Sequence, residues 1–208
     1  WSSDVCSSDL VVGSGGHAQS CLEVIESTRK FKIVGLISND DKLGDIKHGY
    51  RVIGDDTTLA KSQAFAQLAF VAFGSIRIPI KRNEMFLKLL EFGFEIPTII
   101  SPEAYVSPSA IVEMGSIVHH KAYIGPGVRI GKNCIVNTGA IIDHGCIIDS
   151  NTHISTGAIL NGGVLIGKNT FIGSGAKVRQ GLEIGSNCFV NMGLLIKKNI
   201  DDSTRITK

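Results

Sequence analysis

A branched aliphatic residue recurs at every sixth position over the second half of this chain. Seventeen successive positions at this spacing, from Ile100 to Ile196, hold Ile, Val or Leu. A unit of one short strand and one tight turn, repeated three times per coil, builds a triangular β-helix with the aliphatic side chains stacked inside. An ordinary β-sandwich is disfavoured, because its strands do not keep one phase for about a hundred residues.

Turn residues accompany the aliphatic period. The residue after the aliphatic position is often Gly, Asn or Asp, and we expect it to supply the turn conformation. With three six-residue units per coil and about 4.8 Å between stacked strands, the repeat predicts a rod of about five to six coils. Known hexapeptide solenoids of this kind coil left-handed. The expected turn residues are Gly125, Gly131, Asn137, Asp143, Asp149, Gly167, Gly173 and Gly185.

The first half of the chain alternates between strand-like and helix-like segments. Residues 10–13, 31–37 and 68–74 have the apolar character of strands, whereas residues 17–28 and 80–93 have a helical pattern that ends at Gly93. This order predicts a small open α/β sheet of parallel strands.

The change of period divides the chain into two domains. We predict a Rossmann-like α/β domain over residues 10–98 and an all-β, left-handed parallel β-helix over residues 99–208. Residues 1–9 are polar and rich in Ser and lack the basic start and apolar run of a secretory signal. We interpret them as non-native or disordered.

Composition excludes several classes of partner. A net charge of +2 and the lack of any run of five like charges argue against nucleic acid. The longest nearly apolar stretch, residues 64–73, is too short to span a membrane, so we expect a soluble, cytoplasmic protein. The five cysteines form no C-x-x-C pair, and Cys134, Cys146 and Cys188 fall on repeat positions that suit small, reduced core residues.

The segment VVGSGGHA, residues 11–18, follows a predicted strand and opens a predicted helix. Its glycines let backbone N–H groups approach an anion at the positive end of the helix. The full dinucleotide fingerprint is missing, because Ala18 ends the motif and Ser38 and Asn39 follow the second strand where an acidic residue is usual. A tight turn without a ligand is the alternative.

His144 is a histidine that the repeat does not place in the aliphatic core. It follows the inward-facing Ile142 by two residues, which places it on the exposed part of its strand. His153 comes nine residues later and lies on another face of the coil. In a symmetric trimer, His144 of one subunit would approach His153 of another and form a crevice. An incidental surface histidine is the alternative.

The segments GSGGHA and NTGAIIDHGCIIDSNTHISTGAILNGGVLIGKNTFIGSGAKV resemble the bacterial sugar acetyltransferases that join a nucleotide-sugar-binding α/β domain to a left-handed β-helix. This family includes sialic-acid O-acetyltransferases and UDP-4-amino-sugar N-acetyltransferases, and the resemblance spans residues 10–208. It implies an acyltransferase that uses acetyl-CoA and no metal to acetylate a sugar or nucleotide-linked amino sugar for surface glycan biosynthesis. It also implies a homotrimer with active sites between subunits.

The resemblance assigns roles to particular residues. His144 holds the place of the general base, and His153, Gly162 and Gly163 fall along the acetyl-CoA cleft. Further implied acetyl-CoA contacts are Lys168, Ser174 and Gly193. The nucleotide-sugar site is implied for Gly13, Ser14, Gly15, Gly16, His17, Ser38, Asn39 and Gly74.

Acetyl transfer suits these residue types. An amine or hydroxyl that attacks a thioester loses a proton, and an imidazole, whose ordinary pKa is about 6.5, can accept that proton near neutral pH. A backbone N–H of the 162–163 turn is expected to stabilise the oxyanion. Lys168, Lys197 and Lys198 are candidates for binding the CoA phosphates, with plain solvated lysines as the alternative.

The chain departs from the family pattern in two further places. Many members carry Asp or Glu directly after the catalytic histidine, where this chain has Gly145. Asp143 is the remaining candidate for orienting the ring, although neighbours on a strand point to opposite faces. The sequence runs to DDSTRITK without the G-x-P-A-K segment usual in these enzymes, so we expect an incomplete last coil.

Two rival functions remain at this stage. A β-helical zinc carbonic anhydrase needs three converging histidines, and the spacing of His119, His120, His144 and His153 does not provide them. A catalytically impaired homologue that binds nucleotide sugar or CoA would result if Gly145 leaves His144 without an orienting partner.

Overall fold

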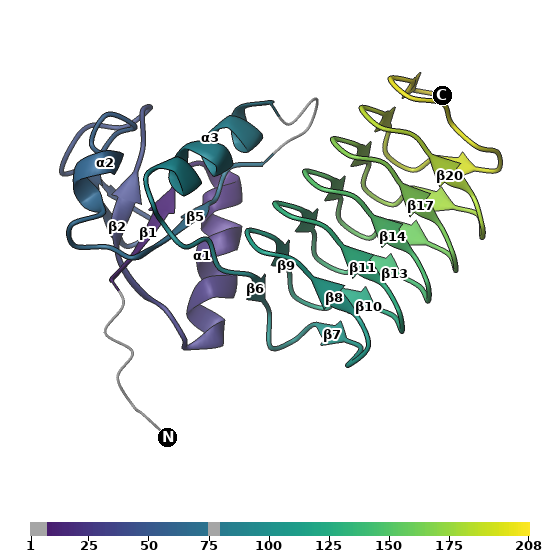
Figure 1. Ribbon diagram of the computed structural model, residues 1–208, viewed down its shortest axis with the longest axis horizontal. Helices are drawn as coiled ribbons and strands as arrows, with labels where there is room; N and C mark the ends of the chain where they lie inside the picture. The colour runs from purple at the N-terminus through teal and green to yellow at the C-terminus, as the bar shows by residue number, and fades with distance from the viewer. Residues whose placement is uncertain (1–7, 75–79) are drawn as a thin grey trace. The chain divides into compact units, whose positions relative to one another are not determined.

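The computed structural model describes residues 8–74 and 80–208, which divide into two compact units (Figure 1). The first unit contains residues 8–74 and 81–97, and the second contains residues 98–208. Within the described segments, none of the helices combines the length and the apolar character needed to cross a bilayer.

The first unit is built on one five-stranded sheet. Its strand order is β3-β4-β2-β1-β5, and β4, β2, β1 and β5 run parallel. The strands are β1 (Ser8–Val12), β2 (Lys32–Ile37), β3 (Ile46–Lys47), β4 (Tyr50–Gly54) and β5 (Leu68–Val71), and the helices are α1 (Gly16–Thr28), α2 (Leu59–Ser62) and α3 (Ile80–Glu91).

The predicted strands and helices of this unit are present, with differences at their ends and at one sheet edge. Strand β3 pairs antiparallel with β4, because His48 and Gly49 take positive φ values of 50° and 85° and close a two-residue hairpin. Strand β1 begins before the predicted start of the domain at residue 10, because Ser8 and Asp9 pair with β2. Residues 1–7 lie outside the described part of the chain.

The second unit is a parallel β-helix with three flat faces. Face 1 contains β6 (Ile99–Ile100), β9 (Ile117–Val118), β12 (Ile135–Val136), β15 (His153–Ile154), β18 (Phe171–Ile172), β21 (Phe189–Val190) and β23 (Arg205–Ile206). Face 2 contains β7 (Tyr105–Val106), β10 (Tyr123–Ile124), β13 (Ile141–Ile142), β16 (Ile159–Leu160), β19 (Lys177–Val178) and β22 (Leu195–Ile196). Face 3 contains β8 (Ile111–Val112), β11 (Arg129–Ile130), β14 (Ile147–Ile148), β17 (Leu165–Ile166) and β20 (Glu183–Ile184).

Three rows of turns form the edges between these faces. We call each row by the faces that it joins. Edge 1/2 contains residues 101–103, 119–121, 137–139, 155–157, 173–175 and 191–193. Edge 2/3 contains residues 107–109, 125–127, 143–145, 161–163, 179–181 and 197–199. Edge 3/1 contains residues 113–115, 131–133, 149–151, 167–169, 185–187 and 201–203.

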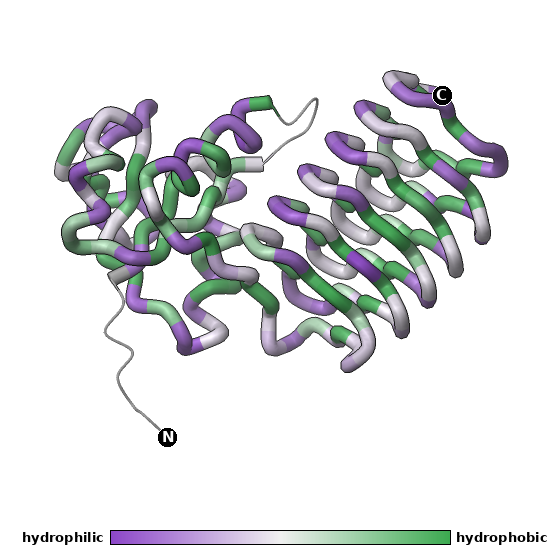
Figure 2. Tube along the Cα trace, in the orientation of Figure 1, coloured by the Kyte–Doolittle hydropathy of each residue, from purple (hydrophilic) through white to green (hydrophobic). Residues whose placement is uncertain are grey.

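The predicted aliphatic stack is confirmed. Each of the seventeen positions is the second residue of a two-residue strand, and those from Val118 to Val190 are at most 2% exposed. Figure 2 shows the result as hydrophobic stretches along the coils that alternate with hydrophilic turns. The predicted cysteine positions also hold, since Cys134, Cys146 and Cys188 are buried free thiols.

The turn conformation is supplied by a different residue from the one predicted. Positive φ occurs at the third position after each aliphatic residue from Val112 to Val190, for example Gly145 at 66° and Asn151 at 60°. Glycine at the first position has another cause, a close approach of the next coil. A Cβ atom on Gly173 would lie 2.5 Å from the backbone nitrogen of Met192.

The last coil is shorter than the others. Strand β23 pairs with β21 at a sequence offset of sixteen residues, whereas β21 pairs with β18 at eighteen. On face 3 of this coil, Ile200 forms a single parallel bridge with Ile184 instead of a two-residue strand pair. The last coil is therefore two residues shorter than the coils before it.

Candidate active site

His144 lies in the turn at 143–145, on edge 2/3, directly after strand β13. Oδ1 of Asp143 accepts the backbone N–H of His144 at 2.7 Å and lies 3.0 Å from the ring atom Nδ1. The sequence argument that places neighbouring side chains on opposite faces does not apply, because both residues belong to a turn and not to a strand. Asp143 therefore reaches the ring.

The contact with Asp143 defines which ring nitrogen is available. The hydrogen bonds from the backbone and ring of His144 lower the pKa of Asp143, so this carboxyl is ionised near neutral pH. An ionised carboxylate can only accept hydrogen bonds, which makes Nδ1 the donor and leaves the lone pair of a neutral ring on Nε2. The His144 side chain is 62% exposed, so Nε2 can be reached from solvent.

Gly162 lies against the imidazole from the next coil. A Cβ atom at this position would come within 2.5 Å of both Cε1 and Nε2 of His144. The backbone N–H of Gly163 donates to the carbonyl of His144 at 2.8 Å, which fixes the spacing of the two turns. That N–H group is therefore already used, and the predicted oxyanion donor of this turn can only be Gly162.

The repeat explains why residue 145 is a glycine. Its φ of 66° matches the positive φ of Gly127, Gly163 and Gly181, which occupy the same turn position in neighbouring coils. Glycine adopts this backbone conformation without a steric penalty. Many family members are expected to have Asp or Glu at this position. In this chain the carboxylate beside the ring comes instead from Asp143, the residue before His144.

The other predicted acetyl-CoA residues do not gather around His144 within one chain. His153 is on face 1, where it is 6% exposed and meets the edge of Phe171 with ring centroids 5.2 Å apart. Ser174 is on edge 1/2, where its hydroxyl lies 2.9 Å from that of Ser155 and its carbonyl accepts the N–H of Gly193.

The predicted lysines also fall on two different edges. Lys168 lies on edge 3/1, whereas Lys197 and Lys198 lie on edge 2/3, the edge that carries His144. The predicted residues of one chain thus fall into two groups, which we call the candidate partial sites. One contains Asp143, His144 and Gly162, and the other contains His153, Ser174 and Gly193.

In the first unit, the glycine-rich turn lies where β1 ends. Gly13 has a φ of 121°, and a Cβ atom there would lie 3.3 Å from the backbone of Ala72 and Phe73, so glycine lets the β1 and β5 ends approach. Gly15 is the N-cap of α1 and Gly16 its first residue. Parallel sheets bind ligands at the carboxyl ends of strands where the strand order reverses, as it does here between β1 and β5.

The remaining predicted residues of this unit lie at the same sheet edge. The hydroxyls of Ser14 and Ser38 are 2.8 Å apart. A Cβ atom on Gly74 would lie 3.5 Å from the ring of His17. Asn39 is turned toward another partner, because its side-chain oxygen accepts the backbone N–H of Asp56 at 3.0 Å.

Three residues of this edge were missed from the sequence. Asp41 accepts hydrogen bonds from Ser14 and Ser38 and pairs with Lys47 at 2.6 Å. The hydrogen bond from Lys47, followed by that from Ser14, lowers the pKa of Asp41 to about 2. His48 donates from Nε2 to the carbonyl of Ser14 at 2.8 Å. An acidic residue, Asp41, thus lies near the end of β2, two positions beyond Asn39.

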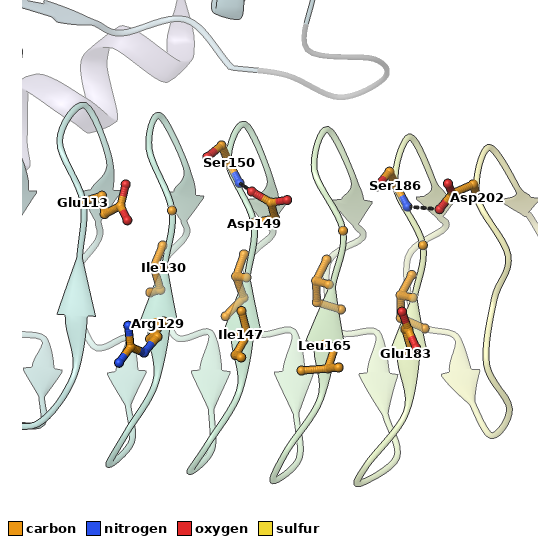
Figure 3. A pocket seen from close by; sticks show the side chains of 16 residues that line it. Glu113, Arg129, Ile130, Ile147, Asp149, Ser150, Leu165, Glu183, Ser186 and Asp202 are labelled. Atoms are coloured by element: carbon orange, nitrogen blue, oxygen red, sulfur yellow. Dashed lines mark hydrogen bonds between the residues drawn. The ribbon is translucent and has the colours of Figure 1, made fainter.

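A groove of about 410 Å³ runs along face 3 (Figure 3). Its floor contains Ile147 and Leu165, with Arg129 and Glu183 on neighbouring strands. At its rim, Oδ1 of Asp202 accepts the backbone N–H of Ser186 at 2.6 Å. None of the predicted site residues lines this groove.

Comparison with known proteins gives matches over both units. The PglD N-terminal domain family matches residues 10–86, and the GMPPB C-terminal domain family matches residues 97–201. No curated protein sequence matches the chain.

Solved structures match almost the whole chain. The acetyltransferase domain of PglB from Neisseria gonorrhoeae FA1090 is 33% identical with a TM-score of 0.87, and the match covers 95% of each chain. A histidine-to-asparagine mutant of perosamine N-acetyltransferase from Caulobacter crescentus, in complex with CoA and GDP-perosamine, is 28% identical with a TM-score of 0.90. That match covers 96% of this chain and 92% of the other.

The fold and these similarities define an acyltransferase with a Rossmann-like domain followed by a left-handed parallel β-helix, as the sequence predicted. The chain belongs to the family of sugar acetyltransferases that join a PglD-type N-terminal domain to such a helix. This family assignment argues against the alternative function of a zinc carbonic anhydrase.

Proposed function

We propose that this protein transfers the acetyl group of acetyl-CoA to a sugar carried by a nucleotide, with His144 as the general base. The observation that carries the proposal is the exposed imidazole of His144, held between the Asp143 carboxylate and Gly162. Its Nε2 atom is available to accept a proton. The same contact argues against an impaired homologue, because Asp143 supplies the orienting partner that Gly145 cannot.

The reaction follows from this geometry. The acceptor nitrogen or oxygen attacks the thioester carbonyl carbon, and its proton passes to Nε2 of His144 as the new bond forms. The carbon–sulfur bond then breaks, and the imidazolium returns the proton to the leaving thiolate, which departs as CoA. The ionised Asp143 stabilises the positive charge on the ring through Nδ1.

The position of the cations on edge 2/3 suits the acyl donor. Lys197 and Lys198 stand three coils beyond His144, roughly 14 Å away at about 4.8 Å per coil. A pantetheine arm spans a distance of this order, so a CoA molecule could extend along the edge with its phosphates at these lysines. Structures of the related PglB domain and perosamine N-acetyltransferase are described with acetyl-CoA or CoA bound, which supports the same co-substrate here.

The acceptor is assigned to the first unit. Gly15 and Gly16 lie at the amino end of α1, which suits the diphosphate of a nucleotide sugar, whereas the backbone N–H of Gly13 already donates to the carbonyl of Ile37 at 2.8 Å. The related perosamine enzyme is described with GDP-perosamine, an amino sugar nucleotide. We therefore favour N-acetylation of a nucleotide-linked amino sugar for glycan assembly over O-acetylation of a free sugar such as sialic acid.

A complete site requires more than one copy of the chain. His144 follows face 2, whereas His153 lies on face 1 and Ser174 on edge 1/2, so the two partial sites are on different sides of one β-helix. A homotrimer with parallel helices brings the partial sites of neighbouring copies together. We propose this assembly as the active form.

The test measures release of free CoA from acetyl-CoA with a panel of acceptors. UDP- and GDP-linked amino sugars are compared with free sialic acid, and the first group should support turnover. His144→Ala should lower turnover by roughly 10²-fold or more without loss of acetyl-CoA binding. Ser150→Ala is the matched control, because Ser150 has the same turn position after Asp149 on edge 3/1. Near-normal turnover of His144→Ala would refute the role of the base.

A further inference from the structure

Three side chains form a hydrogen-bonded cluster at one edge of the first sheet. Ser14 follows β1, Ser38 follows β2, and Asp41 lies three residues after Ser38. The hydroxyls of Ser14 and Ser38 are 2.8 Å apart, and both donate to Oδ2 of Asp41. We call these three residues the serine–aspartate cluster. It joins the glycine-rich turn to the end of β2.

The hydroxyl hydrogens of this cluster point inward. Asp41 is ionised near neutral pH, since its pKa is about 2, and an ionised carboxylate only accepts hydrogen bonds. Each serine hydroxyl has one hydrogen, and both hydrogens are directed at Asp41. The cluster therefore offers lone pairs to a ligand. It suits a group that donates a hydrogen bond and disfavours a phosphate, which would need donors.

Ser14 and Asp41 are the two members that a ligand can reach. Ser38 is 6% exposed, and its hydroxyl oxygen also accepts the backbone N–H of Asp40 at 3.2 Å. Ser14 is half-buried, and the Asp41 side chain is 12% exposed. The acceptors that face solvent are thus the Ser14 hydroxyl and the Asp41 carboxylate.

Lys47 makes this carboxylate compatible with a neighbouring diphosphate. Its ammonium lies 2.6 Å from Oδ1 of Asp41, while the serines use Oδ2. A carboxylate without a cation would repel the phosphates proposed to lie at Gly15 and Gly16, since like charges at short range repel. The ion pair offsets this repulsion and leaves the acceptor character of Asp41 in place.

The hairpin of β3 and β4 holds the cluster in position. Lys47 ends β3, and the next residue, His48, donates from Nε2 to the carbonyl of Ser14 at 2.8 Å. Ser14 is thus fixed through its carbonyl by His48 and through its hydroxyl by Asp41. Groups that are fixed before binding lose little freedom when a ligand arrives, so they discriminate well between ligands.

The place of the cluster indicates which part of a nucleotide it meets. In dinucleotide-binding α/β domains the phosphates lie at the start of the first helix, and an acidic residue about 20 positions later accepts the ribose 2′-hydroxyl. Asp41 follows Gly16, the first residue of α1, by 25 positions. The ribose also carries the first hydrogen-bond donors beyond the α-phosphate of a nucleotide sugar.

We propose that Asp41, with the Ser14 hydroxyl that it orients, accepts a hydrogen bond from the ribose 2′-hydroxyl and thereby selects ribonucleotide sugars over 2′-deoxyribonucleotide sugars. A 2′-deoxyribose has no donor at this position, so it would leave the desolvated carboxylate with one partner fewer. A site built to bond a substrate hydroxyl rejects an analogue that lacks it. The inference rests on the proposed nucleotide-sugar site and narrows its substrate class.

Binding of nucleoside diphosphates to the full chain tests the inference without acetyl transfer. Isothermal titration calorimetry compares UDP with dUDP and GDP with dGDP. For the preferred base, the ribose form should bind about 10-fold or more tightly than the deoxyribose form. The 2′-fluoro analogue of that nucleotide cannot donate at this position and should bind as weakly as the deoxy form. Equal affinity of the ribose and deoxyribose forms, or full affinity of the fluoro analogue, would overturn the inference.

Substitutions at two neighbouring carboxylates assign the effect to Asp41. Asp41→Ala should bring the ratio of the two affinities close to 1, mainly by weakening the ribose form. Asp40→Ala removes the exposed carboxylate one position earlier and should keep the wild-type ratio. Asp41→Asn has the same size as the native residue and guards against misfolding, which circular dichroism monitors. It should also lower the ratio, because a neutral amide accepts a weaker hydrogen bond than a carboxylate. A wild-type ratio in a folded Asp41 variant would overturn the assignment.

The outcomes also separate this inference from the proposed function. A protein that selects ribose forms but acetylates no sugar would contradict the proposed function and uphold the selection. Equal kcat/KM for UDP-linked and dTDP-linked amino sugars would uphold acetyl transfer and overturn the selection. Lack of binding by all four nucleoside diphosphates would overturn both the selection and the assignment of the acceptor to the first unit.

Discussion

The Nδ1 atom of His144 lies 3.0 Å from Oδ1 of Asp143, the residue directly before it in the chain. The same oxygen accepts the backbone N–H of His144, so one carboxylate holds both the turn and the ring. This arrangement depends on the turn, since consecutive residues of a strand point to opposite sides. It gives His144 an orienting carboxylate from the residue before it, while the residue after it is Gly145.

Removing this carboxylate should lower turnover more than binding. Asp143→Ala is expected to reduce kcat on the order of 10-fold to 100-fold with little change in KM, because the imidazolium loses its stabilising charge. Asp143→Asn should recover part of the loss, since an amide oxygen can still accept the ring N–H. Steady-state kinetics with acetyl-CoA and the preferred sugar measure both effects. Asp149→Asn changes the equivalent aspartate of edge 3/1 and should leave kcat unchanged.

A methyl group on Gly162 should displace the imidazole of His144. The added Cβ atom would lie 2.5 Å from Nε2, and the side chain of His144 can move away without moving the backbone. Gly162→Ala should therefore lose about 10-fold or more in kcat with a nearly unchanged Tm. Gly173→Ala gives the opposite pattern, a lowered Tm, because its Cβ would meet the backbone of Met192. Equal loss of Tm in both variants would argue against a role for Gly162 at the ring.

Mixing two inactive variants should restore activity if the site is shared. His144→Ala and His153→Ala remove the two different halves of the proposed site, and neither trimer alone should turn over. After the two proteins are denatured together and refolded, mixed trimers contain some sites with both histidines. Recovered CoA release in the mixture, absent from a mixture made without refolding, would support the shared site. No recovery from correctly folded mixed trimers would count against it.

Asp41 should make the stability of the first unit depend on acidic pH. Its pKa is about 2 in the folded chain, against an ordinary value of 3.8, chiefly because Lys47 donates to it. The folded state therefore binds fewer protons, and the stabilisation is complete above about pH 4 and is lost as the pH falls toward 2. Tm measured from pH 5 to pH 2 should show a gap between wild type and Asp41→Asn that closes over this range. A gap that is constant with pH would contradict the assignment.

The aliphatic stack should carry the stability of the β-helix. Ile148 is 1% exposed, whereas its neighbour Ile147 is 47% exposed on the same strand. Ile148→Ala should lower the free energy of unfolding by about 2–5 kcal/mol, since it leaves a cavity between coils. Ile147→Ala should have an effect of about 0.5 kcal/mol or less. Chemical denaturation, fitted with one m-value for all variants, measures the difference in the free energy of unfolding.

Local pattern was enough to predict the β-helix and the exposed position of His144. The period of six places Ile142 and Ile148 in the core, because a repeated unit meets the same neighbours in every coil. Features that depend on the exact turn geometry were predicted less accurately. The positive φ of Gly145, two residues later than the predicted turn position, follows from how one coil rests on the next.

The sequence alone therefore determined the change from an α/β region to a repeat and the stacked core, since both depend on spacing along the chain, and its resemblance to a known family supplied the general base candidate. Tertiary structure decided what surrounds that base. The contact with Asp143 requires the turn geometry, and the approach of Gly162 joins residues eighteen positions apart that meet only after a full coil closes. The Asp41 pair with Lys47 likewise requires the hairpin of β3 and β4. Such contacts are set by the backbone path in space, which spacing alone does not specify.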